Sequence, residues 1–237
     1  MSQHPRPTFT YLGHAAVRCD LPGGEVVLID PWVSNPRCPE TLRRFERVDA
    51  ILLTHAHSDH VGETIEIAKL HKPRRVIANY ELCGWLSSQG VDHCSGMNPG
   101  GMQDVLGLQV HMVRADHSSS FEHNGQTVYG GVAAGFVVRL PGGYTFYHAG
   151  DTALFSDMQL LAELHRPELA FLPIGDLFTM DPQQAARACR FLEVRKVVPI
   201  HWGTFPALTG TPEQLVKAID DLGVKCEVLT LQPGDSY

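Results

Sequence analysis

Six residues, His55 to His60, constrain this chain more than any other feature, because they crowd three histidines and one aspartate into one short segment. The segment reads His-Ala-His-Ser-Asp-His and follows the apolar run 48–53. In an extended segment, residues two apart leave the backbone on the same side, so His55 and His57 face one point, while Asp59 and His60 can face a second. A polar, solvated loop is the alternative, but it gives no reason for an apolar strand to deliver the cluster. The segment therefore predicts two metal ions, which at a separation of about 3.5–4 Å can share one activated water.

Three further residues have the chemistry and the placement to complete such a site. His117, Asp151 and His201 each follow or end a hydrophobic run, where loops carried by a rigid sheet present catalytic groups. Each one alone is more often a hydrogen-bonded structural residue. Their order after the histidine-rich segment favours the metal site instead.

The series His-x-His-x-Asp-His, then His117, Asp151 and His201, resembles the metal-binding signature of the metallo-β-lactamase superfamily over nearly the whole chain. Four flanking phrases narrow the resemblance to the metal-dependent hydrolase family that is similar to L-ascorbate-6-phosphate lactonase. These phrases are Leu-Gly-His-Ala at 12–15, Ile-Asp-Pro at 29–31, Pro-Ile-Gly-Asp at 173–176 and Phe-Thr-Met at 178–180.

The resemblance implies a ligand set for each of two divalent metal ions, zinc or manganese, with iron also possible. The implied ligands are His55, His57 and His117 on one ion, Asp59, His60 and His201 on the other, and Asp151 between them. Members that hydrolyse β-lactams commonly place a cysteine in the second set. The corresponding residue here is Asp151, which argues against antibiotic hydrolysis.

The periodicity and the resemblance together predict an α/β (α+β) fold, a four-layer αββα sandwich of two mixed sheets in one domain, 1–237. Two hairpins share a Pro-Gly-Gly turn about half a chain apart, as a duplicated layout would produce. Ser156, Asp181 and Thr211 read as helix N-caps, and Gly90 and Gly223 as helix ends. The predicted strands are 8–12, 15–20, 25–30, 50–53, 75–78, 108–113, 134–140, 144–148, 169–172, 196–200 and 225–231.

Composition excludes several classes of function. The formal net charge of −7 and the lack of clustered lysine and arginine disfavour nucleic-acid binding. No apolar stretch reaches the length of a membrane span, and residues 1–7 lack the apolar core of a secretory signal, so we expect a cytoplasmic protein that does not bind membranes. The sequence leaves the oligomeric state open, and a homo-oligomer is one possibility.

Other residues are candidates for catalysis or substrate binding. We expect Asp59 to act as both metal ligand and orienter of the attacking hydroxide, and His14 to contact the substrate or act as an acid, although a structural role for His14 is the alternative. Asp30, with a turn-forming role as its alternative, and His148 are candidates for contacts that orient the ligands. The predicted pocket and its mouth are formed by Asp176, Thr179, Met180, Trp202, Thr204 and Phe205.

The predicted activity is that of a binuclear metal-dependent hydrolase, in which a hydroxide bridging the metals attacks a small, anionic metabolite, either a lactone or a phosphate ester. A phosphodiesterase is the alternative enzyme, because the same hydroxide would serve it. A metal-binding protein with a catalytically idle site is the alternative outside enzymes. For both enzyme hypotheses the expected binding partner is a small-molecule substrate.

Overall fold

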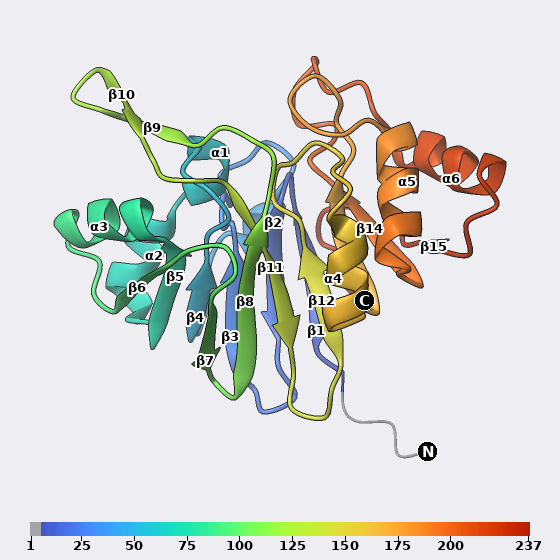
Figure 1. Cartoon of the computed structure of the whole chain (residues 1–237). Coiled ribbons are helices and arrows are strands. Elements are labelled where there is room, and N and C mark those ends of the chain that lie inside the picture. Colours follow the sequence, from blue (N-terminus) through green and yellow to red (C-terminus); the bar gives the residue numbers. More distant parts are fainter. Residues whose placement is uncertain (1–5) are drawn as a thin grey trace.

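A computed structural model describes residues 6–237, in which two large mixed β-sheets pack face to face with helices on both outer faces (Figure 1). The four-layer αββα sandwich expected from the sequence is therefore confirmed. The first five residues of the N-terminus lie outside the described range.

The first sheet has six strands in sequential order. Its first two pairings, β1 with β2 and β2 with β3, are antiparallel, and the pairings from β3 to β6 are parallel. The strands are β1 Thr8–Gly13, β2 Ala16–Asp20, β3 Val26–Ile29, β4 Ala50–Leu52, β5 Arg75–Asn79 and β6 Cys94–Met97.

The second sheet repeats this order of pairing. Strands β8, β11 and β12 pair antiparallel, β12 to β15 pair parallel, and β7 adds an antiparallel edge. The strands are β7 Met102–Val105, β8 Leu108–Arg114, β11 Ala134–Arg139, β12 Thr145–His148, β13 Leu169–Pro173, β14 Lys196–Ile200 and β15 Glu227–Val228.

The remaining elements are one separate hairpin and the helices. The hairpin consists of β9 Ser120–His123 and β10 Gln126–Tyr129 and projects above α3 (Figure 1). The helices are α1 Ser58–Val61, α2 Thr64–His71, α3 Tyr80–Ser88, α4 Met158–His165, α5 Pro182–Leu192, α6 Pro212–Asp221 and the 3₁₀ turn Glu40–Leu42.

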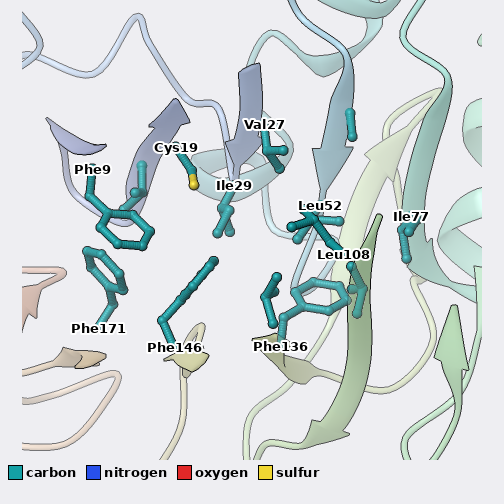
Figure 2. Close-up of a cluster of buried hydrophobic side chains, with 14 of the residues drawn as sticks. Phe9, Cys19, Val27, Ile29, Leu52, Ile77, Leu108, Phe136, Phe146 and Phe171 are labelled. Atoms are coloured by element: carbon teal, nitrogen blue, oxygen red, sulfur yellow. The ribbon is translucent and has the colours of Figure 1, made fainter. Parts of the chain in front are cut away.

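Alternation along the strands explains the layers. In β3, Val27 and Ile29 point into the core between the sheets, whereas Val26 and Leu28 point toward α2 and α3. In the second sheet, Phe136 and Phe146 enter the same central core, and their strand neighbours pack under α4, α5 and α6. Figure 2 shows the aromatic and aliphatic side chains of the two sheets facing each other. Because each sheet is covered on both faces, its central strands are apolar throughout rather than alternating.

The two Pro-Gly-Gly turns predicted from the sequence are observed with the same hydrogen bonds. Leu21 N–H bonds the Glu25 carbonyl at 2.8 Å, and Leu140 N–H bonds the Tyr144 carbonyl at 2.8 Å. In each turn the second glycine bonds back to the leucine carbonyl, at 2.9 Å in the first and 3.0 Å in the second. The repeat proposed from the sequence therefore extends to turn geometry.

Several local predictions need correction. Asp181 and Thr211 cap α5 and α6 as predicted, and Gly90 and Gly223 follow the ends of α3 and α6. Ser156 is not an N-cap, because α4 begins one residue later behind Asp157 without a side-chain cap. The strand predicted at 225–231 contracts to the two residues of β15. Strands β6, β7, β9 and β10 were not predicted, since their short, polar sequences carry little periodicity.

No helix among residues 6–237 combines the length and the apolar character that crossing a membrane would require.

Candidate metal centre

Four loops at one edge of the two sheets bring the predicted ligands together. The loop after β4 and the start of α1 carries His55, His57, Asp59 and His60, and the other three come from the ends of separate strands of the second sheet: His117 after β8, Asp151 after β12 and His201 after β14. Their ligand atoms form three overlapping groups within 4.8 Å: His55, His57 and His117; His14, Asp59, His60 and His201; and His55, His60 and Asp151.

Asp151 lies between the two halves of this cluster. Its Oδ2 is 3.5 Å from Nε2 of His117, 3.3 Å from Nε2 of His60 and 3.0 Å from Nε2 of His201. One carboxylate oxygen therefore faces imidazoles of both predicted ligand sets, which is where a carboxylate shared by two cations would lie.

Asp30 sets the orientation of His60. Its side chain is fully buried, and Oδ2 lies 2.7 Å from Nδ1 of His60. Because a carboxylate only accepts hydrogen bonds, Nδ1 carries a proton, and Nε2 is the nitrogen that faces Asp151 and would bind a cation on losing its own proton. Asp30 thus occupies the orienting position expected from the sequence.

The same carboxylate also acts on His55 through Thr54. The Thr54 hydroxyl donates to Asp30 Oδ2 at 2.6 Å and lies 3.0 Å from His55 Nδ1. Since its single proton is used toward Asp30, the hydroxyl accepts from Nδ1–H, and Nε2 of His55 is free. That Nε2 lies 3.0 Å from Nδ1 of His57, so two ring nitrogens of the first set converge. Thr54 was not predicted, although it directly precedes His55.

His14 contacts the carboxylate of Asp59. Its Nε2 is 3.0 Å from Asp59 Oδ2, its Nδ1 is 3.0 Å from the Thr204 hydroxyl, and its ring is fully buried. The ring has no exposed surface and does not line the cleft over the cluster, so in this structure its contacts are with Asp59 and Thr204. Thr204 likewise acts through His14.

The pKa values of the buried groups in the cluster are shifted by their neighbours and by burial. Burial alone would lower the pKa of His60, but the Asp151 and Asp30 carboxylates raise that pKa well above its usual value. Burial would raise the pKa of Asp151, yet His201 and His60 hold it well below its usual value. For His55, burial is the largest influence and lowers the pKa well below its usual value. The aspartate is therefore ionised and the facing His55 neutral, as metal ligation requires.

Unpaired polar atoms provide a direct test of whether a cation fits. Within residues 6–237, His60 Nε2 and Asp151 Oδ1 are buried and have no hydrogen-bond partner. A buried polar atom without a partner costs free energy, so its retention calls for an explanation. A cation bound by this nitrogen and the Asp151 carboxylate would supply the missing partner, and the residues fit a metal ion.

Unusual backbone conformations position several of these groups. His14, Asp30 and His201 adopt positive φ angles of 54°, 46° and 56°, which few non-glycine residues do. The His14 carbonyl accepts bonds from the Tyr11 hydroxyl at 2.9 Å and from the His201 N–H at 2.7 Å, so a turn of the first sheet is tied to a ligand of the second.

Glycines permit the close approach of the loops. A Cβ on Gly175 would lie 2.2 Å from the His201 carbonyl oxygen, and one on Gly150 would lie 2.7 Å from Thr54 Cβ. These glycines lie next to two residues singled out from the sequence, Asp176 and Asp151, but the sequence does not predict their role in packing.

His148 acts on the backbone before Asp151. Its Nε2–H donates to the Ala15 carbonyl at 3.0 Å, and its Nδ1 accepts from Gly150 N–H at 3.2 Å. Burial lowers the pKa of His148, and both ring nitrogens are satisfied in the neutral form. The ring therefore links the two sheets beside the site without reaching the ligands.

A cleft of about 480 Å³ opens over the cluster, and we call it the metal cleft. Its lining includes His57, Asp59, Asp151 and three apolar side chains, Leu177, Phe178 and Phe205. None of the lining residues, all within 6–237, is a lysine or arginine. An anionic substrate would find no cationic side chain here.

Five of the six residues predicted to form the pocket do not line the metal cleft, among them Thr204, the partner of His14. Met180 is fully buried under α5, and Asp176 faces a separate hollow, where it accepts a 3.3 Å hydrogen bond from Thr209. Thr179 bonds the Met180 carbonyl, and Trp202 packs under the Arg37 guanidinium 4.1 Å away. The intervening Leu177 and Phe178 line the cleft instead, because the chain turns at positive φ through Asp176 and Leu177.

Known proteins are similar to this chain in sequence and in fold. A family model for the Beta-lactamase superfamily domain matches residues 25–202. A UPF0173 metal-dependent hydrolase of Koribacter versatilis is 47% identical over 96% of both chains, and one of Methanopyrus kandleri is 42% identical over 96% of this chain and 98% of that protein. The solved structure of Igni18, a metallo hydrolase from Ignicoccus hospitalis, superposes with a TM-score of 0.86 at 33% sequence identity, and the match covers 98% of this chain and 97% of that chain.

Proposed function

The chain belongs to the β-lactamase superfamily as a UPF0173 metal-dependent hydrolase, and we propose that it holds two divalent metal ions and hydrolyses an ester bond in a small metabolite, a lactone in preference to a phosphate ester. The observation that carries this proposal is the position of Asp151, whose Oδ2 lies 3.0–3.5 Å from imidazoles of both ligand sets. A site for a single ion would not need a carboxylate between two groups of histidines.

The proposed ligands divide as the family resemblance implies. His55, His57 and His117 hold one ion, Asp59, His60 and His201 hold the other, and Asp151 is shared. The set contains nitrogen and oxygen donors without thiolate, a chemistry that suits zinc, manganese or iron. Such ions, when bound, lower the pKa of water so that it can attack at neutral pH.

Asp59 is the proposed catalytic carboxylate. Burial would raise its pKa, but the hydrogen bond from His14 and the nearby His60 lower it below the usual value, so the side chain is anionic. Its side chain is 25% exposed and lines the metal cleft, within reach of a substrate. His14 holds the Asp59 carboxylate through Oδ2, which fixes the orientation of the carboxylate relative to the attacking water. His14 is a positioning residue.

The lining favours a carbonyl centre over a phosphate. A phosphate ester carries negative charge, which proteins usually hold with arginine or lysine, and neither lines the cleft among residues 6–237. A lactone carbonyl needs only polarisation and an oriented water. The expected anionic character of the substrate accordingly has no support from the side chains of the cleft, and only the proposed metal ions would attract a negative charge there.

The proposal is tested by loading the protein with zinc or manganese and measuring both bound metal and activity. We expect two ions per chain by elemental analysis after dialysis, and acid release in weak buffer from lactones, with less from phosphodiesters. Bound metal without release of acid from any lactone, phosphate ester or thioester would support the catalytically idle alternative. A stoichiometry of one ion would contradict the binuclear proposal.

A further inference from the structure

A second hollow of about 420 Å³ runs beside the metal cleft, and we call it the side groove. His57 and Asp59 line both hollows, so the groove opens directly from the proposed ligands. Its volume is within the range of small-molecule sites, about 300–1,000 Å³. Nothing in the ligand chemistry of the metal centre requires such a groove.

Apolar side chains from different parts of the chain form one part of the walls of the side groove, beside polar residues. Phe121 of β9 stacks on Trp85 of α3 with ring centroids 4.3 Å apart and an interplanar angle of 29°. Val61 at the end of α1 and Ile65 in α2 also line the groove, together with Ala56 beside the ligands. Partly exposed aromatic and branched side chains around a continuous hollow provide a surface for an apolar group.

Hydrogen bonds hold the base of the β9–β10 hairpin in place. The Ser119 hydroxyl donates to the Gly130 carbonyl at 3.1 Å and accepts from Ala56 N–H at 3.2 Å. The Asn79 amide donates to the carbonyls of Gly130 and Val132 at 2.8 and 3.0 Å. The groove is therefore built into the fold, because both ends of the hairpin are anchored, to the segment after β4 and to the last residue of β5.

The charges around the side groove oppose an anionic occupant. Glu66 and Glu122 line the groove and are exposed. No lysine or arginine among residues 6–237 lines it. A carboxylate or phosphate placed there would face two like charges. A neutral apolar group would bury its surface against Trp85, Phe121 and Ile65 without such a penalty.

We propose that the side groove binds the alkyl substituent of a neutral lactone or ester whose carbonyl lies at the metal centre. This inference rests on the proposed function, and it narrows the substrate class to neutral, alkyl-bearing molecules. Because His57 and Asp59 line both hollows, the alkyl substituent and the reacting carbonyl would lie in one continuous site.

Chain-length dependence tests the inference with the metal-loaded protein. Across γ-butyrolactone, γ-hexalactone and γ-octalactone, kcat/KM measured by acid release should rise about 3- to 4-fold per added methylene, the gain expected from burying each group. Ile65→Gln should reduce the octalactone preference at least about tenfold. Leu70→Gln, at a 76% exposed position of the same helix, should leave it unchanged. A flat series, or a preference for a lactone chain ending in carboxylate, overturns the inference.

Binding without hydrolysis separates this inference from the proposed function. Methyl ketones carry a carbonyl and a chain but no bond to hydrolyse, and titration calorimetry should show 2-decanone binding at least about tenfold more tightly than 2-hexanone. If no ester is hydrolysed but this difference holds and is lost in Phe121→Ala, the proposed chemistry fails and the side groove stands. If esters are hydrolysed and the ketones bind equally, the groove proposal fails alone.

Discussion

The two sheets repeat one order of strand pairing but supply the metal ligands in different ways. In the first sheet a single loop after β4 carries four of the seven proposed ligands, whereas the second sheet contributes one ligand from each of three strand ends. The loop after β13, which follows the strand corresponding to β4, carries no proposed ligand and presents Leu177 and Phe178 to the metal cleft. Equivalent scaffolds have therefore acquired different tasks.

The contacts between the halves show that neither half makes the site alone. His148 of β12 bonds Ala15 of the first sheet, and the His14 carbonyl accepts from the backbone of His201. The first half holds the densest ligand group and its buried support, Asp30 and Thr54. The second half closes the site with Asp151 and provides the apolar wall. The difference teaches that a repeated fold leaves function to its loops.

The largest expected effect comes from removing the metals, which bind ligands from both halves. Chelation should abolish hydrolysis and lower the free energy of unfolding by about 4 kcal/mol for each ion, or about 8 kcal/mol for the two proposed ions, if they are present at about a thousand times their Kd. The melting temperature of a chain of this size should fall by about 20 °C, measured by calorimetry with and without EDTA. An unchanged melting temperature would show that the metals do not link the halves.

Replacing the carboxylate of the β4 loop is expected to have the next largest effect. Asp59→Asn keeps the size of the side chain but removes its charge, so kcat/KM should fall about 10²–10⁴-fold, as for loss of a catalytic acid–base group. The corresponding change in the β13 loop, Asp176→Asn, is the matched control and should alter activity less than twofold. The assay is acid release, with circular dichroism to confirm folding. Wild-type rates in Asp59→Asn would refute its proposed role.

A smaller effect is expected from the buried support of the first half. In Asp30→Asn an amide replaces one acceptor of Thr54 and His60, so His60 no longer has a fixed tautomer and metal affinity should fall about 10–100-fold. Competition with a chromogenic chelator measures this affinity. If affinity is unchanged while the protein is folded, Asp30 does not orient the ligands.

The smallest effect tests the second half's support of His14. Thr204→Val removes the hydroxyl 3.0 Å from His14 Nδ1 at nearly constant volume, and the loss of one hydrogen bond, about 1 kcal/mol, should lower kcat/KM about fivefold. Thr209→Val, which removes the bond to Asp176 outside the cleft, is the control and should have no effect on kcat/KM. Equal effects of the two variants would assign the loss to general destabilisation.

The sequence determined the fold class and the identity of the clustered residues. Apolar strands, Pro-Gly-Gly turns and the histidine-rich segment are local signals, and their order along the chain predicted the four-layer sandwich. The residues proposed as ligands were all found at one edge of the sheets because ligands that follow parallel strands emerge on the same side. Asp30 was also identified, since it stands directly at a strand end.

Only the tertiary structure decided how the supporting groups act and where the walls of the site lie. That Thr54 and Asp30 orient His55 and His60 depends on the meeting of two segments, the one after β3 and the one after β4. Leu177 rather than Met180 lines the cleft because two consecutive residues turn at positive φ. The side groove joins segments 56–66, 85 and 120–122, whose contact no periodicity encodes. Local pattern reports which face of a strand is buried, but hydrogen-bond partners and hollows arise from long-range packing, which depends on the whole chain at once.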